Sequence, residues 1–146
     1  MDDVLSEIPA LIFQSVGITN YSHTLKYGYK LIVEVDQGIS EYYRSLIPKC
    51  RKPNSQMYAA HISVVRKEIP DFNCWGAYEG KEILFDYVGH IFFDKIYCWL
   101  NVFSKELENI RLELNLPVSS QYTRPPEGSI ECFHCTLGNF KGQRSS

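Results

Sequence analysis

The sequence predicts an α+β fold built from two related halves within one domain. Its 146 residues suit one compact domain. Hydrophobic residues make up 45% of the chain and charged residues 22%, which is typical of a globular protein. A strand, a helix and a second strand follow one another twice along the chain, which is the pattern of a duplicated unit. The second strand of each unit also carries the same four-residue pattern.

The first unit begins with a strand over residues 29–35 (YKLIVEV), which are bulky and β-branched. Asp36 stands where a helix N-cap is expected, and apolar residues then recur at helical spacing from position 39 to 47. Pro48 ends the predicted helix. After a polar loop, residues 60–65 (AHISVV) form the second predicted strand.

The second unit repeats this order. Residues 97–103 (YCWLNVF) are predicted to form a strand, and Ser104 is the expected N-cap of a helix through residues 106–114 (ELENIRLEL). Pro117 ends that helix, and residues 130–139 (IECFHCTLGN) form the second strand.

The segment between the units contains two further predicted strands, at residues 82–88 and 90–93, which would extend a sheet or bridge the halves. No linker interrupts the chain, so residues 1–146 are expected to form a single domain. Its first lobe spans about residues 13–68 and its second about residues 90–140.

Charge and hydropathy exclude several classes of protein. The N-terminus is acidic, unlike a secretion signal, and no apolar run approaches the ~18 residues of a membrane span. The net charge of −2 argues against binding long nucleic acid through its phosphates, although a small anion in a local pocket is compatible with it. A cytoplasmic protein with no membrane partner is therefore expected.

The cysteines predict no metal or disulfide site. Cys132 and Cys135 form a C-x-x-C pattern, but residues three apart on a strand point to opposite faces. No second C-x-x-C completes a tetrahedral zinc site, so we expect no metal ligands.

The repeated pattern is the feature that carries chemistry. It reads His61-Ile62-Ser63-Val64 in the first unit and His134-Cys135-Thr136-Leu137 in the second. On a strand, the histidine and the hydroxyl residue share one face, and the apolar residues point to the other. If a pseudo-twofold axis relates the halves, the two pairs face each other across a cleft.

Two such pairs suit acid–base chemistry on a phosphodiester. Imidazole titrates near neutral pH, so one neutral histidine can accept a proton while a second, protonated histidine donates one. The hydroxyls can donate hydrogen bonds to phosphate oxygens, and the arrangement requires no cofactor. The structural alternative is two core histidines capped by neighbouring hydroxyls.

The tandem His-x-Ser/Thr pattern resembles the signature of the 2H phosphoesterase superfamily. The resemblance implies a 2H, or LigT-like, fold: two pseudo-symmetric lobes, each an antiparallel sheet plus a helix, around a central cleft. The catalytic residues would be His61, Ser63, His134 and Thr136, with Ser63 standing where many members have threonine.

Several segments resemble the anti-CBASS phosphoesterases of tailed phages in particular: LKYGYKLIVEVDQ, YYRSLIPK, HISVVRKE, LPVSSQYTRPPEG and FHCTLGN, between about Phe13 and Gly138. This resemblance implies metal-independent cleavage of 3′–5′ linkages in cyclic di- and trinucleotides, in the cytoplasm of an infected bacterium. The ribose 2′-hydroxyl would attack, and a 2′,3′-cyclic phosphate would lead to a 3′-phosphate product. Such cleavage would remove the signals of CBASS immunity.

A nucleotide also needs aromatic and cationic contacts. Tyr29 is a candidate because the resemblance places an active-site tyrosine near the start of the first strand; Tyr97 and Trp99 are candidates in the second unit. The Pro-rich loop before the second motif is a candidate lid, in which Tyr122 would cover a base and Arg124 would pair with phosphate. Each of these residues also suits an ordinary core or surface role.

Two other functions remain open from the sequence. The same fold would serve a phosphoesterase that acts on RNA ends or 2′,3′-cyclic phosphates, or a protein that sequesters a cyclic nucleotide without cleaving it. Two titratable groups argue against sequestration, since binding alone does not need them. The sequence leaves a protein partner and the oligomeric state open.

Overall fold

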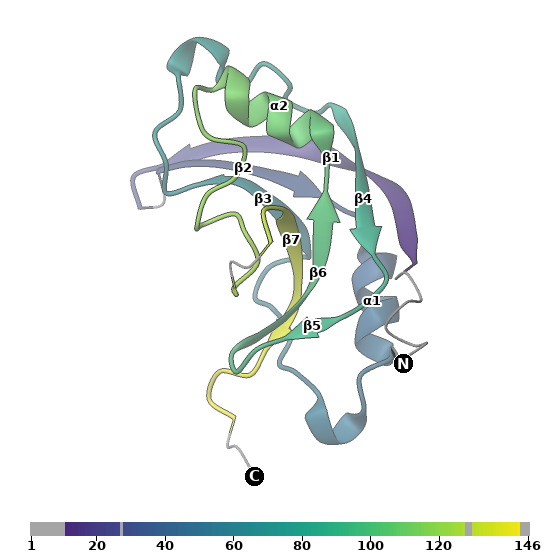
Figure 1. The fold of residues 1–146 in the computed structure, drawn as a ribbon. Coiled ribbons are helices and arrows are strands. Elements are labelled where there is room, and N and C mark those ends of the chain that lie inside the picture. The colour runs from purple at the N-terminus through teal and green to yellow at the C-terminus, as the bar shows by residue number, and fades with distance from the viewer. Residues whose placement is uncertain (1–10, 27, 128–129, 144–146) are drawn as a thin grey trace, which may run out of the picture.

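The protein has an α+β fold in which one large antiparallel sheet is combined with two α-helices (Figure 1). The structure is a computed structural model that describes residues 11–26, 28–127 and 130–143. The predicted fold class is confirmed at this level.

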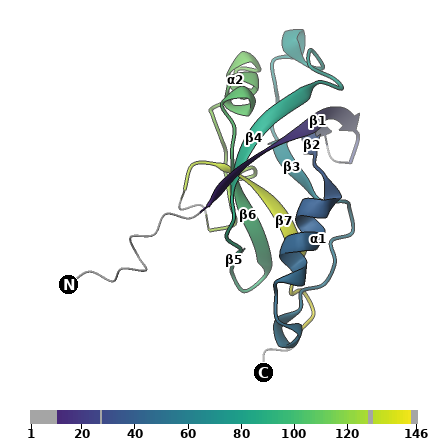
Figure 2. The ribbon, with the colours of Figure 1, turned by 90° about the vertical axis from the view of Figure 1, so that its right-hand side faces the viewer.

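The sheet has seven strands in the order β4-β1-β2-β3-β7-β6-β5, and every neighbouring pair is antiparallel. β4 also pairs with β6, with Asp86 opposite Phe103, so the strand pairings close on themselves. β3 and β7 pair directly with each other, and each is the second strand of one predicted unit (Figures 1 and 2). The strands are β1 (Ile12–Thr24), β2 (Gly28–Glu34), β3 (His61–Arg66), β4 (Glu82–Val88), β5 (Phe92–Phe93), β6 (Tyr97–Phe103) and β7 (Phe133–Asn139).

Both predicted helices and their caps are confirmed. α1 (Gln37–Ser45) lies between β2 and β3, and the Asp36 carboxylate accepts a hydrogen bond from the Gly38 amide at 2.8 Å. α2 (Lys105–Glu113) lies between β6 and β7, and the Ser104 hydroxyl accepts from the Leu107 amide at 3.2 Å. These bonds satisfy amides that a helix N-terminus otherwise leaves unpaired. Short 3₁₀ turns at Lys49–Arg51 and Phe72–Cys74 complete the helical segments of the described residues.

β2 and β3 are each shifted by one residue from their predicted ranges, and three other strands differ more. β1 is a 13-residue strand that the sequence reading did not identify, and it joins β2 to β4. β7 begins at Phe133, three residues later than expected, and β5 contains only Phe92 and Phe93. β4 matches its predicted range and links the two units, because it pairs with both β1 and β6.

The helices cover the apolar face of the strands. α2 and its C-cap residue contribute Leu107, Ile110 and Leu114 to a buried cluster that contains Ile62 and Cys135. Tyr43 of α1 and Ile47, just after its end, belong to a second cluster with Cys98, Leu100 and Leu137. The apolar positions of both motifs are therefore in the core, which orients their polar positions toward the other face of β3 and β7.

Candidate active site

The pairing of β3 with β7 brings the two motifs together. Ile62 lies opposite Cys135 in an antiparallel pair, and both side chains are buried. One step to either side of this pair, antiparallel register sets His61 opposite Thr136 and Ser63 opposite His134. Residues directly opposite each other share a face, with Cα atoms about 4.5–5.5 Å apart. Two histidines and two hydroxyls therefore lie side by side on adjacent strands, related by an approximate twofold at the Ile62–Cys135 pair.

Both strands bulge immediately after the hydroxyl residue. In β3, Ser63 pairs with Ile32 but Leu31 pairs with Val65, so Val64 is the extra residue. In β7, Thr136 pairs with Trp99 but Cys98 pairs with Gly138, so the extra residue there is Leu137. A β-bulge bends its strand and re-aims side chains, and bulges are common beside active sites. The fourth position of each motif is thus the bulge.

Both imidazole rings are anchored in the same way. Nδ1 of His61 lies 2.9 Å from the carbonyl oxygen of Ala59, and Nδ1 of His134 lies 3.1 Å from that of Thr123. A carbonyl oxygen can only accept, so Nδ1 carries the hydrogen in each ring. In the neutral form, each Nε2 therefore offers a lone pair to a substrate proton.

The surroundings favour the neutral form of both histidines. The pKa of His134 is lowered to about 4, chiefly by burial, and the positive charges of protonated His61 and of Arg66 act in the same direction. Burial also lowers the pKa of His61, with Lys30 and Arg66 acting in the same direction. Without a bound anion, both rings are therefore neutral at pH 7.

Asn101 and Trp99 of β6 form the neighbouring part of the same face. Asn101 lies opposite His134 and Trp99 opposite Thr136, and the indole Nε1–H donates to Asn101 Oδ1 at 2.9 Å. The Trp99 ring is 1% exposed and packs near Phe92, so it supports the site without a free face for stacking. Asn101 was missed by sequence reasoning, since nothing in its local pattern marks it.

The structure does not bring Tyr29 or Tyr97 to the motif residues. Tyr29 shares the strand face of Leu31 and Val33, opposite the face of Ile32, and stacks on His23 with ring centroids 4.1 Å apart. Tyr97 lies at the start of β6, opposite Asn139, with the Lys141 ammonium 5.2 Å from its ring centroid.

The predicted lid loop contacts the second motif through its backbone. Thr123 is buried and supplies the carbonyl that anchors His134. Arg124 donates to the Ser119 hydroxyl at 2.9 Å and to the Glu131 carboxylate at 3.2 Å, so a phosphate would have to compete with Glu131. Tyr122 is partly exposed, with the Lys67 ammonium 5.6 Å from its ring centroid. Gly128, at the end of this loop, lies outside the described residues.

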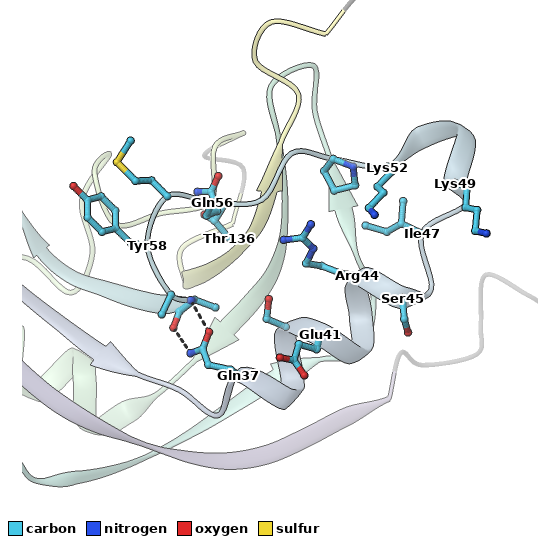
Figure 3. A pocket seen from close by; sticks show the side chains of 15 residues that line it. Gln37, Glu41, Arg44, Ser45, Ile47, Lys49, Lys52, Gln56, Tyr58 and Thr136 are labelled. Carbon is cyan, nitrogen blue, oxygen red and sulfur yellow. Dashed lines mark hydrogen bonds between the residues drawn. The ribbon is translucent and has the colours of Figure 1, made fainter.

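Two cavities flank the segment that leads into the first motif. One, of about 610 Å³, lies between α1 and residues 49–60 and reaches Thr136 (Figure 3). The other, of about 310 Å³, is bounded by β2 and reaches His61. Tyr58 lines both cavities and is exposed, with the Lys30 ammonium 5.3 Å from its ring centroid. Because it is the aromatic residue in the lining of both cavities, Tyr58 is the candidate for stacking on a base. In the sequence, its position three residues before His61 is the one signal that could have identified it.

The C-x-x-C cysteines have the properties of buried structural thiols. Burial raises the pKa of Cys132 to about 11 and that of Cys135 to about 12, so both remain protonated near neutral pH. Across residues 11–26, 28–127 and 130–143, no group of three or more His, Cys, Asp or Glu side chains is arranged to hold a metal ion. Over the same ranges, none of the helices has the length and apolar character needed to cross a bilayer.

No family model, curated protein or solved structure matches this chain. The chemistry of the site therefore follows from its own residues and their geometry.

Proposed function

We propose that this protein is a metal-independent 2H phosphoesterase that cleaves 3′–5′ linkages of cyclic di- and trinucleotides. The observation that carries the proposal is the register of β3 and β7, which sets His61 opposite Thr136 and Ser63 opposite His134. Two identically anchored imidazoles and two hydroxyls then share one face, as acid–base cleavage of a phosphodiester requires.

In the proposed reaction, the Nε2 of one neutral histidine accepts the proton of the ribose 2′-hydroxyl as that oxygen attacks phosphorus. The second histidine, protonated, donates to the departing 5′-oxygen as the P–O bond breaks. Ser63 and Thr136 donate hydrogen bonds to the non-bridging oxygens, where negative charge develops. Water then opens the resulting 2′,3′-cyclic phosphate with the histidine roles exchanged, which leaves a 3′-phosphate.

The proposal includes the two-lobed 2H architecture. Two features support it: the order strand–helix–strand occurs twice, and both motif strands bulge at the same motif position. The resemblance to phage anti-CBASS enzymes extends the proposal to a biological role, in which the protein destroys cyclic-oligonucleotide signals in the cytoplasm of an infected bacterium.

The test is cleavage of a panel of cyclic di- and trinucleotides in EDTA, followed by chromatography and mass spectrometry. We expect a linear product ending in a 3′-phosphate. His61→Ala and His134→Ala should each lower single-turnover cleavage about 10²–10⁴-fold while ligand binding falls much less. His90→Ala, at an exposed histidine remote from both motifs in sequence, is the matched control and should cleave normally.

Ser63→Ala and Thr136→Ala should slow cleavage by about 10²-fold or less, the lower range for loss of one oxyanion donor. Circular dichroism first establishes that all variants fold. Cleavage at the parental rate by both histidine variants would make the pair structural and refute the proposal. A panel that includes 2′,3′-cyclic mononucleotides and RNA ends separates the related phosphoesterase activities.

A further inference from the structure

The larger cavity opens directly beside the proposed reaction centre. Its walls are the side of α1 that carries Ser40 and Arg44, together with Lys49, residues 52–53 and residues 56–60, and it reaches Thr136. Thr136 lies opposite His61, so a ligand whose phosphate meets the motif face extends into this cavity. Its volume of about 610 Å³ lies within the ~300–1,000 Å³ range of small-molecule sites.

The cavity has an excess of positive charge. Arg44, Lys49 and Lys52 line it, against the single carboxylate of Glu41, although the whole chain has a net charge of −2. Figure 3 shows the Arg44 side chain extending from α1 into the space before Thr136, with Lys52 on the facing segment. This local excess favours an anion at that position.

The Arg44 guanidinium differs from those of two other arginines. Arg111 and Arg124 each form an ion pair with a glutamate. Arg44 is half-buried, and its side chain has no hydrogen bond or ion pair to any residue that the structure describes, while its backbone carbonyl accepts from the Ile47 amide at 3.1 Å. A guanidinium presents a rigid fork of donors that matches phosphate. Its five N–H groups are thus available to a ligand in the cavity.

The cavity walls are held in place by bonds that leave this guanidinium free. The Gln37 side chain accepts from the Ala60 amide at 2.9 Å and donates to the Ala60 carbonyl at 3.0 Å, which fixes α1 to the start of the motif strand. On the other side, Asn54 and Asn139 exchange backbone hydrogen bonds at 2.7 and 3.2 Å. The backbone of the cavity walls is thus fixed before a ligand binds, and only side chains such as Arg44 have to be ordered, which reduces the entropic cost of binding.

We propose that this cavity is the subsite for a second, non-reacting phosphate of the oligonucleotide, with Arg44 as its principal ligand and Lys52 beside it. The inference rests on the proposed phosphodiesterase function. A cyclic dinucleotide has two phosphodiesters, so one lies at the histidines while the other meets Arg44. Arg44 would then select substrates with more than one phosphate over those with a single linkage.

The test compares two substrates: a cyclic dinucleotide and a linear dinucleoside monophosphate with a single 3′–5′ linkage. Arg44→Gln should lower kcat/KM for the cyclic substrate about 10–100-fold, the loss expected for hydrogen bonds from a charged group, mainly through KM. For the single-phosphate substrate, kcat/KM of the same variant should stay within about twofold of wild type. That substrate has no second phosphate, so it loses no contact with Arg44.

Arg51→Gln is the matched control, since Arg51 lies on the same segment but its guanidinium sits 5.0 Å from the Phe93 ring centroid, away from the cavity lining. It should leave both substrates unaffected. Lys52→Gln, at an exposed position, should also lower kcat/KM for the cyclic substrate. This second variant keeps the test valid if Arg44→Gln does not fold.

Equal losses on both substrates, or no loss on either, would overturn the subsite. If the wild-type protein cleaves neither substrate, the proposed function fails. Calorimetric binding of the cyclic dinucleotide to wild type and Arg44→Gln then decides the subsite: weaker binding by the variant supports it, and equal binding or none overturns it.

Discussion

Replacement of Arg111 by methionine should destabilise the protein strongly. The Arg111 side chain is 0% exposed, and its guanidinium meets both oxygens of the Glu68 carboxylate, at 2.9 and 2.6 Å. Nη1 also donates to the Val64 carbonyl at 2.6 Å, and Nε to the Pro117 carbonyl at 2.7 Å. One buried side chain of α2 therefore holds the bulge of the first motif strand.

The expected loss follows from what the substitution leaves behind. Glu68 is only 11% exposed at its side chain, so Arg111→Met leaves a nearly buried carboxylate and two carbonyls without their donor. Removal of one partner of a buried ion pair costs about 3–5 kcal/mol. That is a large fraction of the ~5–15 kcal/mol by which a typical domain is stable.

The assay is urea denaturation of wild type, Arg111→Met, Glu68→Gln and the double variant at one pH. The double variant should recover part of the loss, because no unpaired buried charge remains. Lys105→Met is the surface control: its ion pair to Glu108 is 3.9 Å long with Lys105 81% exposed, so the change should stay within about 0.5 kcal/mol. A free energy of unfolding for Arg111→Met within about 1 kcal/mol of the wild-type value would refute this reasoning.

Four further predictions concern pH, packing and metals. The pKa of His134 is 6.5 in the unfolded chain and about 4 in the folded protein, so the unfolded state binds more protons between these pH values. The free energy of unfolding should therefore decline as pH falls from 6.5 to 4. The decline should be shallower in His134→Asn. Since the pKa values of both motif histidines are lowered in the free protein, kcat/KM should follow a bell-shaped curve with its maximum below pH 6.5, and a rate rising steadily to pH 10 would indicate a different base. Gly138→Ala should cost about 1–3 kcal/mol in a thermal or urea unfolding assay, because its Cβ would lie 2.7 Å from the Asn54 carbonyl oxygen and 2.8 Å from Pro53 Cβ; an unchanged midpoint would mean that this segment moves freely. Cleavage should persist in EDTA, and an activity abolished by EDTA and restored by a divalent cation would contradict the metal-free mechanism.

The elements with ordinary patterning were predictable from the sequence. The range of β6 agrees residue for residue, and both helices begin at the expected caps, Asp36 and Ser104. In these segments the apolar residues point into the core, so local periodicity and tertiary structure agree. The repeated order of strand, helix and strand followed from that agreement.

β1 escaped prediction because its patterning is inverted. Its buried positions are Gly17 and Thr19, whereas the large apolar residues Ile12, Val16 and Ile18 are exposed. A Cβ at Gly17 would lie 2.3 Å from Val33 Cγ1, so the neighbouring strand needs a glycine there. The Thr19 hydroxyl is buried because it hydrogen-bonds to the Tyr78 carbonyl. A period-2 reading assigns such a strand to the wrong face or to a loop.

The site was predictable only where it is local. The shared face of His61 and Ser63 follows from strand geometry, but the adjacency of β3 and β7 is a long-range contact that no local pattern specifies. Arg44 and Asn101 reach the site through that long-range packing, so sequence reasoning did not identify them. Tyr29 was a candidate that the structure places elsewhere. It shares a face of β2 with the core residues Leu31 and Val33, and the motif histidines do not lie on that face.

The two motifs are alike in strand geometry and different in what supports them. Ala59, in the segment just before β3, anchors the His61 ring, whereas His134 is anchored by Thr123 in a loop eleven residues away along the chain. The bulge after Ser63 is held by the buried Arg111, which donates to the Val64 carbonyl. In β7, Gly138 follows the bulge and lies against Pro53, which lines the larger cavity. A mechanism with one acid and one base needs two similar groups in dissimilar surroundings, because equal surroundings would give them equal pKa values. The symmetric strands place the groups, and the asymmetric loops and cavity can then give each histidine a different role once an anion binds.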